Sequence, residues 1–114
     1  MPEQTFTKQE RLLTRPQLRR VMDHGRKRRV DRLCLLFVLP NGTQSTRLGI
    51  IASKKVGNAV ERNRAKRKIR EVVRLNKQCF RLGTDVVVVS GKPLVDAPLR
   101  VVEQTLLTHL KDAR

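Results

Sequence analysis

Apolar residues recur at helical spacing near both ends of the chain. Three of them, at i, i+3 and i+4, predict a short first helix: Leu18, Val21 and Met22. Thr14 can cap this helix and Gly25 can end it. A last helix is predicted over residues 97–112, with a packing stripe of four residues: Leu99, Val102, Leu106 and Leu110. Each helix therefore has one apolar side to place against a sheet.

Three runs between these helices have the character of strands. Residues 30–39 are apolar on both faces of the strand that they predict. One face carries Leu33, Leu35 and Phe37. The other face carries Cys34, Leu36 and Val38. A turn signal at residues 40–43 precedes residues 47–53, which we expect to return as the second strand of a hairpin. Residues 85–90 form a β-branched run that is typical of an interior strand.

The order of elements is helix, strand, strand, helix, strand, helix. It predicts an α/β fold, an α+β two-layer sandwich with a mixed sheet of about four strands. The second strand, the helix after it and the last strand would form a crossover unit, which chirality favours as right-handed. The 114 residues fit one domain, 1–114, with a single core. Residues 1–11 are polar without a period and are predicted to be flexible.

The most strongly charged part of the chain is residues 53–74, with nine basic residues against two acidic ones. Asn58 and Glu61 have the spacing of a capping box that starts a helix, and Gly57 suits the turn before it. One side of this helix is predicted to pack through Ala65, Ile69, Val72 and Val73. The opposite side gathers Asn63, Arg67, Arg70 and Arg74. Because there are too few acids to neutralise that side, we expect phosphates to supply the missing charge.

Composition narrows the class of partner. The formal net charge is +16, which favours binding to phosphates or anionic lipids. No uncharged apolar run approaches the roughly 20 residues of a membrane helix, so we expect a cytoplasmic protein with no membrane contact. Cys34 and Cys79 lack metal-ligand spacing and are interpreted as reduced, structural thiols. With only three aromatic residues, base stacking is not expected to supply much affinity.

Candidate catalytic groups are sparse. The ten acidic residues are scattered, without the clustered carboxylates that would hold a metal ion. His24 and His109 could form an acid/base pair, but a helix-end role for His24 and a position on the flank of the last helix for His109 are the stronger interpretation. We therefore predict no catalytic residue and no metal ligand in this chain.

One segment carries a resemblance to a known family. The string from Lys54 to Glu71, with Arg62-Asn63-Arg64 at its centre, closely resembles the signature of the bacterial ribonuclease P protein subunit. The similarity extends over nearly the whole chain, from the first helix to the Lys92-Pro93 pair after the last strand. In that family the protein binds a large catalytic RNA, and the RNA with bound magnesium (Mg2+) cuts precursor tRNA to make its mature 5′ end. The resemblance also implies a rare left-handed crossover, on a fold shared with a ribosomal protein domain.

The resemblance implies roles for particular residues. Those expected to face the catalytic RNA are Arg62, Asn63, Arg64, Arg67, Lys68 and Arg70. Arg74, Lys54 and Lys55 extend the same positive surface. A cleft between the first helix and the sheet would guide the single-stranded leader, and its expected residues are Leu18, Met22 and Leu36, at positions that are commonly aromatic in the family. The implied partners are ribonuclease P RNA and precursor tRNA, with no protein partner required.

Two other functions stay open at this point. A ribosomal or RNA-chaperone protein would be served equally well by this composition. An intrinsic nuclease would have to use His24 and His109. Cleavage of precursor tRNA by the catalytic RNA, measured with and without the chain, distinguishes the first alternative from the ribonuclease P role. RNA cleavage retained by a double-alanine variant of His24 and His109 would rule out the second alternative.

Overall fold

The structure, a computed structural model, describes residues 14–43, 46–76 and 83–112. Its elements follow one another along the chain as α1 (Arg15–His24), β1 (Arg26–Val30), β2 (Cys34–Pro40), β3 (Arg47–Ile51), α2 (Ala59–Leu75), β4 (Thr84–Ser90), the short 3-10 helix η3 (Lys92–Val95) and α3 (Leu99–Asp112). Segment 1–11, Cys79 and the side chain of Leu110 lie outside this description, so the expectations placed on them stay predictions.

The four strands form one mixed sheet in the order β1-β2-β4-β3. β2 is antiparallel to β1 and to β4, whereas β3 is parallel to β4. β4 is therefore an interior strand, as its β-branched run predicts, and five of its seven residues from Thr84 to Val88 are buried in succession. The predicted mixed sheet of an α+β sandwich is confirmed.

The predicted hairpin between the second and third strands is wrong, because β4 lies between them. Val88 pairs with Leu36 of β2 on one side and with Ile50 of β3 on the other. A strand that is apolar on both faces is most stable at the centre of the sheet, where both its edges and both its faces are covered. The turn after Pro40 therefore leads to the far edge of the sheet.

A strand that the sequence analysis missed, β1, occupies the opposite edge. It pairs with β2 from Arg26 opposite Val38 to Val30 opposite Cys34. Residues 31–33 make the connection, and Asp31 adopts a left-handed conformation with φ 50°, which Asp tolerates better than most residues. Because four of its five residues are basic, β1 has no apolar alternation by which a strand is normally recognised.

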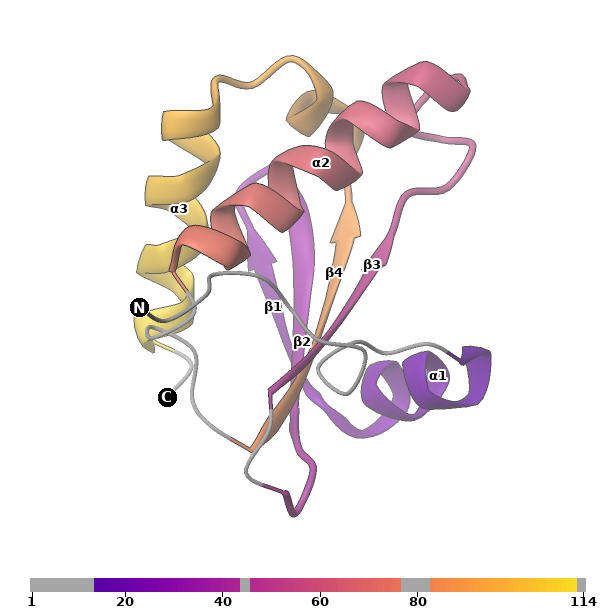
Figure 1. Cartoon of the computed structure of the whole chain (residues 1–114), viewed down its shortest axis with the longest axis vertical. Coiled ribbons are helices and arrows are strands. Elements are labelled where there is room, and N and C mark those ends of the chain that lie inside the picture. Colours follow the sequence, from indigo (N-terminus) through magenta and orange to yellow (C-terminus); the bar gives the residue numbers. More distant parts are fainter. Residues whose placement is uncertain (1–13, 44–45, 77–82, 113–114) are drawn as a thin grey trace.

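The crossover from β3 through α2 to β4 is left-handed. In Figure 1 both strands run upward, α2 passes in front of the sheet, and β4 lies to the left of β3. Connections of this kind are right-handed in nearly all proteins. The hand that chirality favours is therefore wrong for this chain, and the hand that the family resemblance implies is confirmed.

The two faces of the sheet carry separate cores. Alternate residues such as Leu36 and Val88 face α2, α3 and η3 and belong to the larger core with Ile69 and Leu106. The intervening residues face α1, where the buried set is Val21, Phe37 and Val87. Since α1 has only ten residues, it covers part of its face, and several apolar side chains there stay half-buried.

The helix ends mostly follow the sequence. Thr14 and Gln17 form a capping box at the start of α1, and Gly25 ends it. A Cβ at Gly25 would lie 2.5 Å from the Val21 carbonyl oxygen and 2.9 Å from that of Val38, so the turn into β1 leaves no room for a side chain. α3 begins at residue 99, two residues later than predicted. Val102 and Leu106 of its predicted stripe are buried, but Leu99 is 40% exposed.

Candidate nucleic-acid interface

The basic helix α2 starts at a sharply defined place. The Glu61 amide donates to Asn58 Oδ1 at 2.9 Å, and the Asn58 amide donates to Glu61 Oε1 at 3.0 Å, which is the predicted capping box. Gly57, just before it, has φ 148°, a conformation that side chains disfavour. The direction of every side chain on the helix is fixed from this start.

One side of α2 packs and the other is open, as the sequence predicts. The buried residues are the four of the expected stripe: Ala65, Ile69, Val72 and Val73. On the open side Asn63, Arg67 and Arg70 are exposed. Among the described residues no acidic side chain forms an ion pair with either arginine. This part of α2 is therefore an uncompensated cationic surface.

Four further predicted residues lie at the beginning of this surface. Lys54 and Lys55 are exposed in the turn that follows β3. Arg64 is exposed and lies 3.6 Å from Asp96, an ion pair between two solvated groups that contributes little. Arg62 is half-buried, and its Nε atom is buried without a hydrogen-bond partner in the described part of the chain.

Two predicted RNA-facing residues are engaged within the protein. The Lys68 ammonium donates to the carbonyl oxygens of Val95 and Ala97 at 2.5 and 2.6 Å, so it holds the end of η3 against α2 instead of joining the arginines. Partial burial, and then the nearby Arg64 charge, lower the pKa of Lys68. These carbonyl acceptors lie 27 and 29 residues further along the chain, so the contact depends on the tertiary fold.

Arg74 is also engaged in a contact within the protein, an ion pair with Glu71. Its guanidinium donates to both carboxylate oxygens of Glu71, at 3.0 and 2.8 Å. These hydrogen bonds lower the pKa of Glu71 and raise that of Arg74. Arg67 is also one turn from Glu71 along α2, but within the described residues Glu71 pairs with Arg74 and Arg67 forms no ion pair.

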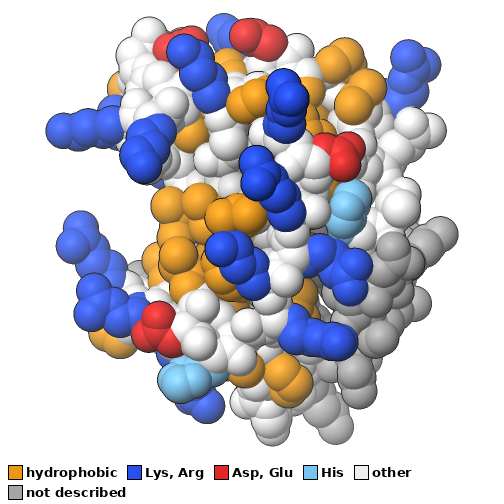
Figure 2. Space-filling view, turned by 180° about the vertical axis from the view of Figure 1, so that it is seen from behind, with side chains coloured by type: hydrophobic (Ala, Val, Ile, Leu, Met, Phe, Trp, Pro, Cys, Tyr) orange, Lys and Arg blue, Asp and Glu red, His pale blue; other side chains and the backbone are white. Residues whose placement is uncertain are grey.

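A groove of about 900 Å3 runs beside α1. Its lining includes Arg15, Leu18, Arg19 and Met22 of α1 together with Ile51 at the end of β3. Met22 is 37% exposed, which is high for a large apolar side chain. Two of the three predicted cleft residues, Leu18 and Met22, are therefore brought together here. In the view of Figure 2 an apolar area is bordered by Lys and Arg side chains.

The third predicted cleft residue, Leu36, is wrongly assigned. It is fully buried on the other face of the sheet, in the core that α2 and α3 cover. Since side chains alternate along a strand, the β2 residues on the α1 face are Leu35, Phe37 and Leu39, and Val89 joins them from β4. The alternation in residues 30–39 contains this signal, because it places Leu36 with Cys34 and apart from Phe37.

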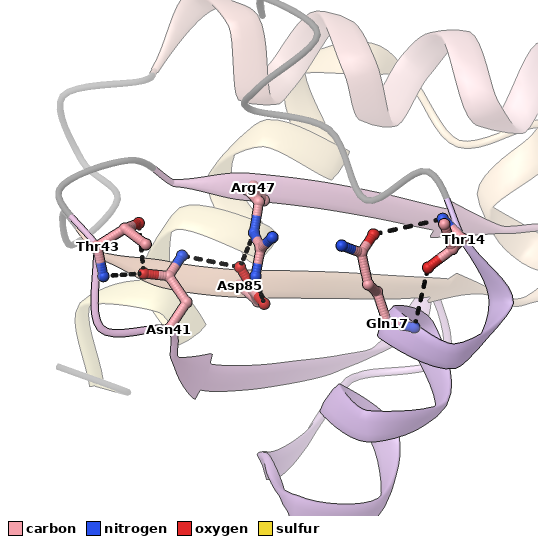
Figure 3. A network of polar contacts seen from close by, with 6 residues as sticks. All are labelled: Thr14, Gln17, Asn41, Thr43, Arg47 and Asp85. Atoms are coloured by element: carbon pink, nitrogen blue, oxygen red, sulfur yellow. Dashed lines mark hydrogen bonds and ion pairs between the residues drawn. The ribbon is translucent and has the colours of Figure 1, made fainter.

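The α1 face ends in a polar network, drawn in Figure 3. Arg47 donates to Asp85 through Nε and Nη2, both at 2.7 Å, and the Asn41 side-chain amide donates to Asp85 at 2.8 Å. Hydrogen bonding to Asp85 is the main reason why the pKa of Arg47 is raised. Asn41 also accepts from the Thr43 amide and hydroxyl, which fixes the loop after β2.

The two histidines do not form a site. His24 is exposed in the last turn of α1, on one face of the sheet. His109 lies on α3, which packs with α2 on the other face, and its Nδ1 is 2.9 Å from the Thr105 carbonyl oxygen. An acid/base pair of these residues is therefore wrong. Within residues 14–43, 46–76 and 83–112, no three His, Cys, Asp or Glu side chains gather as potential metal ligands.

Two remaining features bear on the class of protein. Cys34 is a buried free thiol, and burial raises its pKa to about 12, which fits the inert role predicted for it. None of the helices in the described ranges is both long and apolar enough to cross a membrane.

Comparison with known proteins decides the family. The family model described as Ribonuclease P matches residues 6–114. The chain belongs to this family. The ribonuclease P protein component of Petrotoga mobilis is 40% identical over 94 residues, which span 82% of this chain and 79% of that protein. The corresponding protein of Desulforapulum autotrophicum is 38% identical over 106 residues, or 93% and 90% of the two chains.

Solved structures agree with this ribonuclease P assignment. The ribonuclease P protein of Thermotoga maritima has a TM-score of 0.82 and 31% identity, covering 92% of this chain and 98% of that one. The Staphylococcus aureus protein has a TM-score of 0.78 and 30% identity, covering 90% and 93%. The chain is thus the protein subunit of ribonuclease P, an endoribonuclease to which it contributes as a non-catalytic component acting in tRNA processing.

Proposed function

We propose that the open side of α2 is the surface by which this subunit binds the catalytic RNA of ribonuclease P. The observation that carries the proposal is the exposure of Arg67 and Arg70 without an acidic partner among the described residues. Like charges one turn apart destabilise a helix by a few tenths of a kcal/mol per pair, and phosphates remove that cost. Guanidinium groups contact phosphates in pairs of hydrogen bonds, and Asn63 can reach sugar or base edges.

Residues at the start of α2 extend the proposed RNA surface. Lys54 and Lys55 add exposed charge beside the first turn, and Arg64 is held only by a weak ion pair. Arg62 is half-buried and its Nε is shielded from solvent, so a contact with RNA at this position has to use the exposed remainder of its side chain. Lys68 and Arg74, in contrast, form contacts within the protein: Lys68 holds the end of η3 against α2, and Arg74 pairs with Glu71.

We place the single-stranded leader of precursor tRNA in the groove beside α1. Leu18, Met22 and Leu35 offer apolar surface to bases, while Arg15 and Arg19 can take phosphates. Phe37 is only 6% exposed, so this face of the sheet offers bases apolar packing contacts and little aromatic surface for stacking.

The catalytic RNA with its bound Mg2+ performs the hydrolysis in this proposal, as the family resemblance implies. The protein supplies contacts on two separate surfaces, one for each RNA partner. We expect it to act in the cytoplasm with ribonuclease P RNA and precursor tRNA, and to require no other protein.

Reconstitution with the catalytic RNA tests the proposal. Replacing Arg64 and Arg67 together with Glu should weaken assembly strongly, whereas replacing Arg26 and Arg100 with Glu changes the net charge equally at two exposed residues that belong to neither proposed surface. If about six phosphates are neutralised, wild-type affinity should fall roughly 10³-fold between 50 and 200 mM salt. Equal assembly by the two double variants contradicts the proposal. No effect of wild-type protein on precursor cleavage would favour the RNA-chaperone alternative.

A further inference from the structure

The edge strand β1 is a second concentration of positive charge, and the proposed RNA surfaces do not use it. Four of its five residues are Lys or Arg: Arg26, Lys27, Arg28 and Arg29. Among the described strands only β2 pairs with it, and three of these four residues, Arg26, Lys27 and Arg29, are exposed.

The register of β1 divides its charges between the two faces of the sheet. Lys27 pairs with Phe37 and Arg29 with Leu35, so both basic side chains project from the α1 face. Arg26 pairs with Val38, whose side chain packs on the opposite face, towards the larger core. Two neighbouring basic residues therefore border the face that holds the groove.

A row of apolar residues across the sheet connects Arg29 to the groove. Leu35 is followed across the sheet by Val89 of β4 and then by Ile51 of β3, which lines the groove. All three side chains are half-buried. In the view of Figure 2, an apolar area has Lys and Arg side chains on both sides of it. The row that begins at Arg29 thus runs from a cation, over partly exposed apolar side chains, to the groove.

The charge at this border is not neutralised within the described residues. Arg29 Nε donates to the Asp31 carbonyl oxygen at 3.3 Å, a contact that orients the guanidinium without cancelling its charge. No ion pair involves Lys27 or Arg29 in the described ranges. Charged residues on an edge strand also prevent edge-to-edge aggregation, but that role does not require cations beside a partly exposed apolar row.

We propose that Lys27 and Arg29 bind phosphates of a single-stranded RNA segment that leaves the α1 groove and crosses β2 towards the sheet edge. The bases lie against Leu35 and Val89, and the backbone faces the two cations, an arrangement that suits single strands of varied sequence. The segment is the part of the precursor leader farthest from the cleavage site. This inference rests on the proposed binding of the leader in the groove.

The test uses holoenzyme reconstituted with Lys27→Gln/Arg29→Gln protein and precursor tRNAs of increasing leader length. The matched control, Arg26→Gln/Arg100→Gln, removes two charges away from this border. Affinity for long leaders should fall about tenfold in the first variant, since two charge-assisted contacts are lost, and should not change for leaders too short to reach β1. The salt dependence for long leaders should decrease by about 1.4 in slope, the single-strand value for two phosphates.

The outcomes are distinguishable. Circular dichroism first establishes that both variants fold. An equal loss for short and long leaders overturns the inference, because β1 would then contact the catalytic RNA or the tRNA body. No loss at any length also overturns it. If wild-type protein itself gives no leader-dependent affinity, the groove proposal fails. If wild-type affinity does depend on the leader but the Lys27→Gln/Arg29→Gln variant binds equally well, the groove proposal stands and the role proposed for β1 is wrong.

Discussion

Arg47 and Asp85 face each other directly across the parallel strands β3 and β4, and two hydrogen bonds of 2.7 Å join their side chains. The Asp85 side chain is 7% exposed, and it also accepts from Asn41. This cluster ties together the loop after β2, the first residue of β3 and the start of β4. It stabilises the end of the α1 face where the connection from β3 through α2 enters β4.

Asp85→Asn should destabilise the protein by about 3 kcal/mol, since one partner of a largely buried ion pair is lost and the other stays behind. Urea unfolding followed by circular dichroism measures the change. Asp96→Asn is the matched control: the Asp96 side chain is 88% exposed and 3.6 Å from Arg64, so its loss should cost less than about 0.5 kcal/mol. Equal effects of the two substitutions would contradict a structural role for the Arg47–Asp85 pair.

Lys68→Met should lower stability with little effect on RNA affinity, because the Lys68 ammonium caps the carbonyl oxygens at the end of η3. We expect a loss of about 1–3 kcal/mol from the acceptors left unsatisfied. Arg67→Met should do the reverse, leaving stability within about 0.5 kcal/mol and reducing the salt slope of RNA binding by up to about 1. If Lys68→Met reduced the salt slope of RNA binding and left the stability unchanged, Lys68 would be an RNA-binding residue and its structural role would be wrong.

Cys34 should resist alkylation in the folded protein. Burial raises the pKa of its thiol from 9.0 to about 12, so at pH 8 only about 10⁻⁴ of it is thiolate. Iodoacetamide labelling of a Cys79→Ser variant should be slow in buffer and fast in urea. Because the folded-state pKa is the higher one, the stability contribution of the neutral thiol is complete below pH 9 and is lost as pH rises towards 12. Rapid labelling of the folded variant would contradict this.

Anions should stabilise the free protein. The formal net charge of +16 includes the exposed, unneutralised surface of α2, so we expect partial unfolding at low ionic strength. Sulfate should raise the unfolding midpoint more than chloride at equal ionic strength, because it binds the folded surface in addition to screening it. Thermal melts by circular dichroism measure this. A spectrum that does not change with added sulfate would be evidence against it.

The helices and the basic surface could be predicted from the sequence by itself, because their determinants are local. The stripe from Ala65 to Val73 follows from a 3.6-residue period, and the Asn58–Glu61 capping box from residues three apart. These signals place Arg67 and Arg70 opposite the core without knowledge of the sheet. The long match around Arg62-Asn63-Arg64 indicated the family for the same reason, since it is a contiguous string.

The arrangement of the strands and the exact membership of the site were decided by tertiary structure. Any strand edge can hydrogen-bond to any other, so the sequence could not reveal that β4 separates β2 from β3, or that the basic residues of β1 pair with β2. The family resemblance implied that Leu36 lies in the cleft, and alternation could not correct this by itself, because it defined the two faces of β2 but not which face α1 covers. Lys68 has its carbonyl partners 26 to 29 residues away in sequence, and only folding brings them within reach of its ammonium.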